Sequence, residues 1–262
     1  MTLLERKLVD LLHKLKNDYG VIGLKAEFEA EGSRREELLR LKNIMDKVGG
    51  LTFTLKLGGA EAVTDLYDAI LLGADYIVAP MIESSYALKK YLGIIKNNVP
   101  ESNKDTIFFG INLETIHSYY DLHNILLVPG IEQLKFVTVG RVDLSGSLGI
   151  SRDEINSEQM FLIVKDIFTH VKAKGLECAL GGGIAKEALS FIKRLPNNLI
   201  DRYETRKVVF SKPKDYTTAE KGILLANEFE VLWLENKREY YGQIFREDDK
   251  RIEMIRKRLK LR

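Results

Sequence analysis

The stretch TIFFGINLETIHSYYDLHNILLVPGIEQLKFVTVGRVDL, residues 106–144, decides the fold of this protein. An apolar run over residues 106–114 is followed by a helix-like segment over residues 116–126 and a second apolar run over residues 136–144. Runs that are apolar nearly throughout are typical of strands that are covered on both faces. The order strand, helix, strand predicts a unit in which the two strands are parallel and the helix lies outside them.

The same alternation extends along the chain in both directions. Further strand-like runs, each followed by a helix-like segment, lie over residues 21–30, 51–58, 76–82, 176–182 and 201–210. A capping box formed by Ser33 and Glu36 is predicted to open the first of these helices. No strand is followed by a G-x-G-x-x-G or Walker loop, which disfavours an open doubly wound sheet. The pattern therefore predicts a TIM-type (β/α)₈ barrel of class α/β, with seven strands recognised and one canonical strand not evident.

Length and composition agree with one barrel. The chain has 262 residues, of which 45% are hydrophobic and 30% are charged, and these values are ordinary for a globular protein. The C-terminal segment has more apolar residues, among them Trp233 and Phe245, than its own barrel should bury, which favours a homo-oligomer. We expect a single barrel domain over residues 1–262, made of an N-terminal helix (1–20), a barrel core (21–215) and a C-terminal helical extension (216–262).

Charge and cysteine content restrict the partners and the compartment. The formal net charge of +2 gives no global electrostatic reason to expect nucleic acid or a membrane surface as a partner. The single cysteine, Cys178, cannot form an internal disulfide and is expected to be a small core residue. No apolar run approaches the roughly 18 residues of a membrane-spanning helix. These features predict a cytoplasmic protein.

Two carboxylates mark the expected site. In a barrel the functional residues lie at the carboxyl ends of the strands, and Glu114 and Asp143 end consecutive strand-like runs. Adjacent strands bring such groups close together, and two carboxylates with water suit octahedral Mg²⁺ or Mn²⁺. The alternative is that each carboxylate only caps the helix that follows its strand.

Two sequence motifs carry a resemblance to one known protein family. GINLET (110–115) followed by VGRVDLSGSLG (139–149) resembles the HpcH/HpaI aldolase and citrate lyase β-subunit family of phosphoenolpyruvate/pyruvate-type TIM barrels. That family has an I-E-T-type strand end and, about thirty residues later, a G-P-x-D-L-S-x-S-L-G strand and loop. LTFTLKLGGAEAV (51–63) and GADYIVAPMIESSYAL (73–88) are similar to two further strands of the family. The resemblance extends over residues 21–210.

The resemblance implies a class II, divalent-metal-dependent lyase or aldolase that acts on a 2-oxo acid through a pyruvate enolate. Its ion, Mg²⁺ or Mn²⁺, would be held by Glu114 and Asp143. Ser145, Gly146 and Ser147 would let the substrate carboxylate approach backbone N–H groups. An aldehyde or a phosphorylated compound is the expected co-substrate. A lyase of CoA thioesters, a phosphoenolpyruvate-type enzyme and a non-catalytic metabolite-binding barrel stay open as alternatives.

Three cationic positions are expected to contact the substrate. The family's arginine, which supports the enolate oxygen, falls on Lys56. Lysine keeps the positive charge but lacks the planar guanidinium group, which can donate two parallel hydrogen bonds. Arg141 replaces the usual proline of the family motif. Arg206 is placed on the last strand. Either arginine is a candidate for guanidinium contacts with the substrate, and a salt bridge from Arg206 to Glu204 or Glu27 is the alternative.

The expected base and the glycine turn complete the predicted site. The base region of the family falls on residues 27–30, where its histidine is absent, so Glu27, Glu29 or a metal-bound water would act as the base. Crowding of the two carboxylates is expected to raise one pKa. Gly182 lies in a three-glycine turn over residues 181–183, at a place where many barrels bind phosphate. Tight packing between strand and helix explains the turn equally well.

Overall fold

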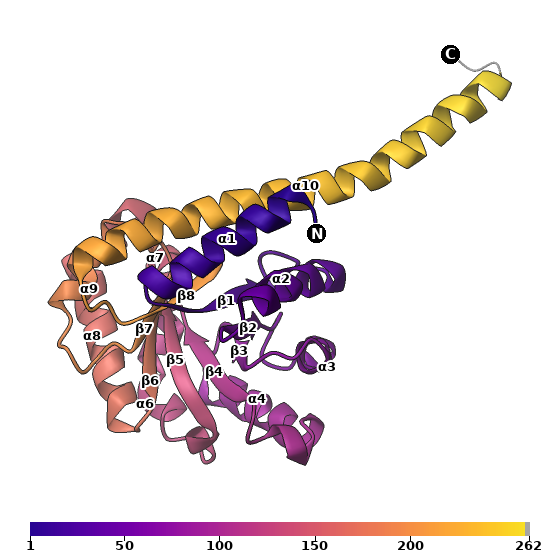
Figure 1. Ribbon diagram of the computed structural model, residues 1–262. Helices are drawn as coiled ribbons and strands as arrows, with labels where there is room; N and C mark the ends of the chain where they lie inside the picture. Colours follow the sequence, from indigo (N-terminus) through magenta and orange to yellow (C-terminus); the bar gives the residue numbers. More distant parts are fainter. Residues whose placement is uncertain (260–262) are drawn as a thin grey trace.

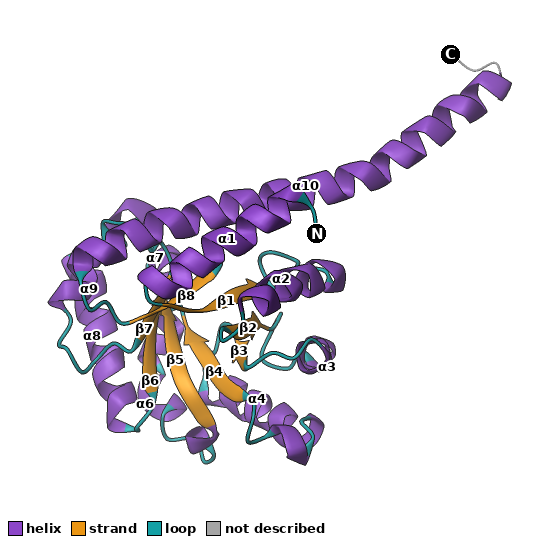
Figure 2. Ribbon diagram, in the orientation of Figure 1, coloured by secondary structure: helices purple, strands orange, loops and turns teal. Residues whose placement is uncertain are grey.

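The computed structural model describes residues 1–259 and contains a closed barrel of eight strands that follow one another in chain order (Figures 1 and 2). The strands are β1 (Val21–Glu27), β2 (Thr52–Lys56), β3 (Tyr76–Ala79), β4 (Phe108–Leu113), β5 (Leu134–Gly140), β6 (Glu177–Gly181), β7 (Arg202–Glu204) and β8 (Val208–Ser211). The predicted TIM-type barrel is therefore confirmed, and all eight strands are present.

Helices surround the barrel, as the strand–helix alternation predicts. They are α1 (Leu3–Asp18), α2 (Arg35–Val48), α3 (Val63–Leu71), α4 (Ser85–Asn98), α5 (Ile116–Tyr120), α6 (Leu122–Ile125), α7 (Arg141–Ser147), α8 (Glu158–Ala173), α9 (Ala188–Arg194) and α10 (Tyr216–Leu259). Short 3₁₀ turns lie at η1 (Glu101–Asn103), η2 (Ile131–Gln133) and η3 (Arg152–Glu154).

The strand that the sequence did not reveal lies inside the last predicted one. The single strand expected over residues 201–210 is a hairpin of β7 and β8, and β8 runs antiparallel to both β7 and β1. The turn between them is closed by Thr205, whose N–H donates to the carbonyl of Val208 at 2.9 Å. The Thr205 hydroxyl in turn accepts from the N–H of Val208 at 3.1 Å. A hairpin thus replaces the last helical crossover.

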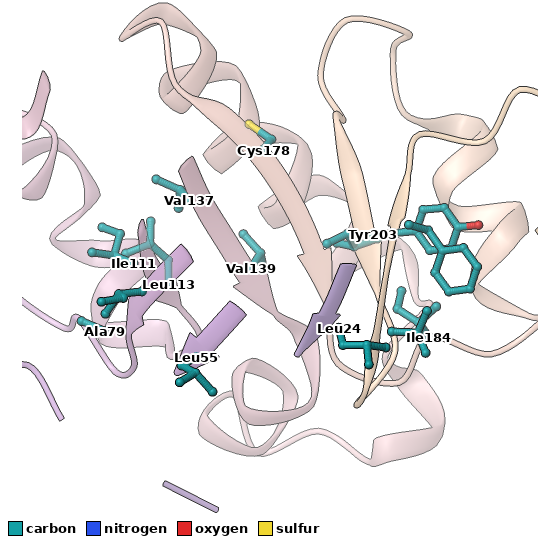
Figure 3. Close-up of a cluster of buried hydrophobic side chains, with 14 of the residues drawn as sticks. Leu24, Leu55, Ala79, Ile111, Leu113, Val137, Val139, Cys178, Ile184 and Tyr203 are labelled. Atoms are coloured by element: carbon teal, nitrogen blue, oxygen red, sulfur yellow. The ribbon is translucent and has the colours of Figure 1, made fainter. Parts of the chain in front are cut away.

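Apolar and polar residues of the strands alternate between the two faces of the barrel wall. Val137 and Val139 of β5 and Cys178 of β6 belong to the large core between the barrel and its helices (Figure 3). Their neighbours on the chain face inward, where Phe136 packs with Tyr76. Since Cys178 is fully buried, it is the core residue that the sequence predicted.

Two of the differences from the predictions concern residues close to the site. The capping box at Ser33 does not form: α2 begins at Arg35, its cap has no side-chain hydrogen bond, and Ser33 donates instead to Glu31 at 3.3 Å. The strand expected to run through residue 144 ends at Gly140, and α7 begins at once. Asp143 therefore lies in the first turn of a helix, where the helix dipole favours a negative charge.

The C-terminal extension is one helix of 44 residues. Its first part packs along α1 and over the barrel, and its buried side chains include Ile223, Phe229 and Trp233. The last of its buried residues is Asn236, and Tyr241 still donates a hydrogen bond of 2.8 Å to Glu37 of α2. The C-terminal part of the helix projects away from the barrel (Figure 1). Within residues 1–259, no helix combines the length and the apolar character needed to cross a membrane.

Candidate active site

A cavity of about 410 Å³ opens at the carboxyl ends of the parallel strands. Its charged lining consists of six acidic and four basic side chains, which leaves two negative charges in excess. The acidic residues are Glu27, Glu29, Glu114, Asp143, Glu204 and Glu230, and the basic residues are Lys25, Lys56, Arg152 and Arg206. All of the predicted catalytic and metal-binding residues thus line one cavity, as converging strand ends in a barrel require.

Lys56, at the end of β2, is held by two carboxylates. Its ammonium nitrogen lies 3.1 Å from Glu27 Oε2 and forms a second ion pair with Glu29. Glu27 is the register partner of Lys56 on β1, so the parallel pairing of the two strands creates the contact. Burial by itself lowers the pKa of Lys56, but the charges of Glu114, Glu27 and Glu29 outweigh burial and raise this pKa above its ordinary value.

Glu27 also binds Arg206, which is not on a strand as predicted but in the turn between β7 and β8. Arg206 Nη2 lies 3.1 Å from Glu27 Oε1, and Arg206 Nε lies 3.1 Å from Glu31. Burial would raise the pKa of Glu27, but the charges of Lys56, Lys25 and Arg206 lower it overall. The predicted crowding of carboxylates therefore does not raise the pKa of Glu27.

Glu114 follows β4 and is only 2% exposed. Its two carboxylate oxygens accept hydrogen bonds of 3.0 Å from the N–H of Met81 and from the amide of Asn112. Met81 has a φ of 49°, which is rare for a residue with a side chain. Gly140 makes room for the carboxylate, because a Cβ there would lie 2.5 Å from Glu114 Oε2. Burial raises the pKa of Glu114 despite the nearby charge of Lys56, and Asp143 raises it further.

The chemistry of this side of the cavity fits a divalent cation. Glu114 is a buried carboxylate, Asp143 lies close enough to repel its charge, and both offer the oxygen donors that Mg²⁺ and Mn²⁺ prefer. One divalent ion would also balance the two excess negative charges of the lining. Among the described residues, no group of three or more His, Cys, Asp or Glu side chains is placed to hold a metal. Protein ligands would therefore be these two carboxylates, with water or substrate at the other positions.

The predicted substrate-binding residues are not brought together. Gly182 lines the cavity, and its φ of 72° and close packing against the backbone of Arg141 both require glycine. Ser145 and Ser147 hydrogen-bond within the protein, to the carbonyls of Val142 and Leu144 respectively. Neither serine lines the cavity, and the same is true of Gly146.

Arg141 is fully buried and faces the protein, not the cavity. Its guanidinium donates to the carbonyl of Gly182 at 2.9 Å and to Asn156 Oδ1 at 2.6 Å, and it lies 4.8 Å from the ring of Phe191. Burial lowers its pKa to about 10, so the group stays charged at neutral pH. Arg141 therefore ties two loops together and does not line the cavity.

Sequence reasoning missed several lining residues. Lys25, in the middle of β1, lies 2.6 Å from Glu204 of β7, and Asn112 holds Glu114. A signal for both was available, since Lys25, Glu27 and Glu29 alternate along the strand predicted over residues 21–30. Asn112 and Glu114 alternate in the same way along the strand predicted over residues 106–114, and residues two apart in a strand face the same side. Asn227 and Glu230 of α10 also line the cavity. Their placement depends on how a distant helix docks, which no local pattern reveals.

No family model and no curated protein sequence matches this chain. Solved structures do match. An HpcH/HpaI aldolase from Desulfitobacterium hafniense DCB-2 has a TM-score of 0.58 and 14% identity, over 78% of this chain and 83% of that chain. An HpcH/HpaI aldolase/citrate lyase family protein from Burkholderia cenocepacia J2315 has a TM-score of 0.58 and 14% identity, over 90% and 99%. Citrate synthase SbnG has a TM-score of 0.57 and 16% identity, over 74% and 89%. The resemblance seen in the sequence is thus confirmed at the level of the fold.

Proposed function

We propose that this protein is a divalent-metal-dependent carbon–carbon lyase, an enzyme similar to class II aldolases that acts on a 2-oxo acid through the enolate of pyruvate. The observation that carries the proposal is the presence, in one cavity, of the carboxylate pair Glu114 and Asp143 and the ammonium group of Lys56. The likeness in fold to aldolase and citrate synthase structures supports the same class of reaction. The proposed cofactor is Mg²⁺ or Mn²⁺, and the proposed co-substrate is an aldehyde or a phosphorylated compound.

Glu114 and Asp143 are the residues that would hold the ion. When bound, a divalent ion supplies Lewis-acid chemistry, polarising a carbonyl oxygen and balancing the negative charge of an enolate. Asn112 and the backbone of Met81 fix the Glu114 carboxylate before any ligand arrives. Because the group is already oriented, little reorganisation is needed on binding.

Lys56 supplies a fixed positive charge. Its raised pKa keeps the ammonium protonated throughout the neutral range. Glu27 and Glu29 hold this ammonium in place beside Glu114. An oriented charge in a partly buried site stabilises negative charge that develops on a substrate oxygen. Lysine acts here as a point charge, without the two parallel hydrogen bonds of an arginine.

Glu29 is the better candidate for the proton acceptor. Its side chain is 22% exposed and lines the cavity, whereas Glu27 is 7% exposed and held by two cations. The lowered pKa of Glu27 also makes it the weaker base. We therefore assign Glu27 and Arg206 to positioning Lys56, and Gly182 to letting substrate approach the main chain.

Calorimetric titration of the full chain tests this function. Mn²⁺ should bind the wild type, and oxalate and pyruvate should bind more tightly once Mn²⁺ is present. Glu114→Gln and Asp143→Asn should each remove Mn²⁺ binding, because each takes away a charge that a hard cation needs. Asp153→Asn is the matched control, since its carboxylate does not line the cavity. Undiminished Mn²⁺ affinity in both site variants would refute the proposed metal site.

Turnover separates the enzyme classes. Pyruvate consumption that depends on an added aldehyde, or pyruvate release from a hydroxylated 2-oxo acid, supports the aldolase. Activity confined to a CoA thioester or to phosphoenolpyruvate would support the related enzymes instead. Protection of the fold by pyruvate against heat, without turnover of any of these compounds, would indicate a metabolite-binding barrel.

A further inference from the structure

The outer part of α10 has no cover within the described chain. Every residue from Gln243 to Leu259 is exposed, whereas Tyr241 still contacts Glu37 of α2. This outer part, the projecting helix (residues 243–259), extends from the barrel as a single helix (Figure 1). In proteins, most of the stability of a helix comes from the packing of an amphipathic face. The projecting helix therefore lacks the contact that would normally stabilise it.

The projecting helix has an apolar stripe with the spacing of a coiled coil. Phe245, Ile252, Ile255 and Leu259 follow one another at intervals of seven, three and four residues, which places them on one face. These four residues are between 40% and 68% exposed. Large apolar residues that are gathered on one exposed face mark an interaction surface. Their spacing is the one by which two helices pack side by side.

The charges of the projecting helix are divided between its two ends. An acidic block, Glu-Asp-Asp at residues 247–249, lies nearer the barrel, and a basic block, Arg-Lys-Arg at residues 256–258, lies at the outer end. Among the described residues, no ion pair involves a side chain beyond Lys237, so neither block is paired there. Helices that lie on membrane surfaces have a polar face rich in lysine and arginine. The acidic block therefore favours a protein as the partner.

The order of the two blocks selects one orientation for a second copy of the chain. In a parallel pair of projecting helices, acidic block would lie beside acidic block and basic block beside basic block. In an antiparallel pair, each acidic block lies beside the basic block of the other copy. Charged residues that flank an apolar seam set the orientation of paired helices. Two copies are therefore complementary only when their projecting helices run antiparallel.

Ile252 marks the centre of this complementarity. When two copies run antiparallel about Ile252, residues at equal distances before and after it come level with each other. Three such pairs have opposite charges, one is apolar and one has like charges. In that order they are Arg251 with Glu253, Asp248 with Arg256, Glu247 with Lys257, Phe245 with Leu259, and Arg246 with Arg258.

Asp248 adds an independent constraint, because it lies within the apolar stripe, between Phe245 and Ile252. In a parallel pair the two Asp248 carboxylates would meet in the seam, and like charges brought together at an interface are destabilising. In the antiparallel pair each Asp248 is level with Arg256 of the other copy. A single polar residue in an apolar seam specifies the register of paired helices at a cost in stability.

We infer that the projecting helices of two copies of this chain pair antiparallel, as a two-stranded coiled coil with Ile252 at its centre. The two barrels then lie at opposite ends of the pair. The inference goes beyond the proposed function, because no residue of the projecting helix lines the cavity. It states which surface joins the copies of the expected homo-oligomer and in which orientation.

Cysteine cross-linking of the full chain tests the orientation. The native Cys178 is fully buried, so Phe245→Cys and Leu259→Cys each provide one accessible thiol. The two positions are about 21 Å apart along a helix, which is too far for a disulfide. After subunit exchange and mild oxidation, a mixture of the two variants should form the mixed disulfide, and neither variant should form one alone. A disulfide in each variant alone, or the absence of the mixed disulfide, would overturn the inference.

Charge reversal tests the complementarity while the apolar residues stay in place. The first variant reverses the basic block: Arg256→Glu/Lys257→Glu/Arg258→Glu. It sets acidic residues beside acidic residues, so sedimentation equilibrium should show self-association weakened at least about tenfold. The second variant adds reversal of the acidic block: Glu247→Lys/Asp248→Lys/Asp249→Lys. The two blocks are then exchanged and complementary again, so self-association should be restored.

A matched control changes the net charge by the same amount elsewhere. It reverses three exposed lysines outside α10, which form no ion pair within residues 1–259: Lys89→Glu/Lys165→Glu/Lys174→Glu. Self-association of this control should stay within about twofold of the wild type, as is usual for surface substitutions. An equal loss in the control would show that net charge alone, and not the pairing of the blocks, governs the contact, and this would overturn the inference.

The remaining outcomes separate this inference from the proposed function. A monomeric wild-type chain would overturn the inference. So would an oligomer that the reversed basic block does not weaken, because its contact would then lie outside the projecting helix. Mn²⁺ binding should be unchanged in all of these variants, since none of the replaced residues lines the cavity. Failure of the helix pairing would therefore leave the proposed function intact, and loss of the proposed function would leave the helix pairing intact.

Discussion

Replacing Lys56 by methionine should destabilise the fold through the carboxylates that it leaves behind. The side chain of Lys56 is 9% exposed and is bound by Glu27 and Glu29. Removing one partner of a buried ion pair typically costs about 3–5 kcal/mol. Glu27 keeps Arg206 at 3.1 Å, so we expect the lower end of this range, about 3 kcal/mol. Methionine fills nearly the same volume, so loss of packing adds little.

A double-mutant cycle isolates the interaction. Glu29→Gln alone should cost about 1 kcal/mol. In Lys56→Met/Glu29→Gln no charge of this pair is left unpaired, so the cost of the double variant should be smaller than the sum of the single costs by about 1–2 kcal/mol. Urea unfolding at pH 7, followed by circular dichroism, measures all four proteins. A coupling free energy of zero, or a Lys56→Met variant as stable as the wild type, would show that the ion pair does not stabilise the site.

Three other predictions follow from the same structure. Gly140→Ala places a Cβ 2.5 Å from Glu114 Oε2, so it should lower the free energy of unfolding in urea by about 1–3 kcal/mol and remove Mn²⁺ binding. An intact Mn²⁺ affinity would contradict the described packing. The lowered pKa of Glu27 means that this group stabilises the fold fully above its pKa in the unfolded chain, near 4.5, and that this stabilisation is lost as the pH falls further. Glu27→Gln should therefore make the melting temperature depend less steeply on pH in the acidic range. Light scattering should show that the full chain is a homo-oligomer. A chain that ends at Gly242 should remain folded, because the buried residues of α10 end at Asn236, and it should become monomeric. A monomeric full chain would refute this assembly.

The converging strand ends could be predicted from the sequence, because their polar residues interrupt apolar runs. Glu114 and Lys56 are of this kind, and both line the cavity. The hairpin of β7 and β8 could not be predicted, since its turn over residues 205–207 contains no glycine, proline or asparagine and is closed by a threonine hydroxyl. A turn of this kind has no strong local signature.

The direction of the side chains after β5 could not be predicted either. Arg141 was expected within a strand that runs through residue 144, but the strand ends at Gly140 and α7 begins with Arg141. Side chains alternate between two faces in a strand but follow a period of 3.6 residues in a helix, so the change from strand to helix turns this side chain from the cavity to the protein interior. Pattern reasoning places element boundaries less well than it identifies the elements, so the residues next to such a boundary are the ones it misplaces.

The closure of the barrel by β1 and β8 sets the order of events when the chain is synthesised. Val21 pairs with Phe210, and α1 packs along α10, so elements that are translated early bind elements that are translated much later. At about 5–20 residues per second, translation separates them by on the order of ten seconds or more. During this time the apolar face of α1, with Leu8, Leu12 and Leu15, has no native cover from α10. The ring therefore cannot close before β8 has been synthesised, and α1 has no cover from α10 until α10 has been synthesised as well.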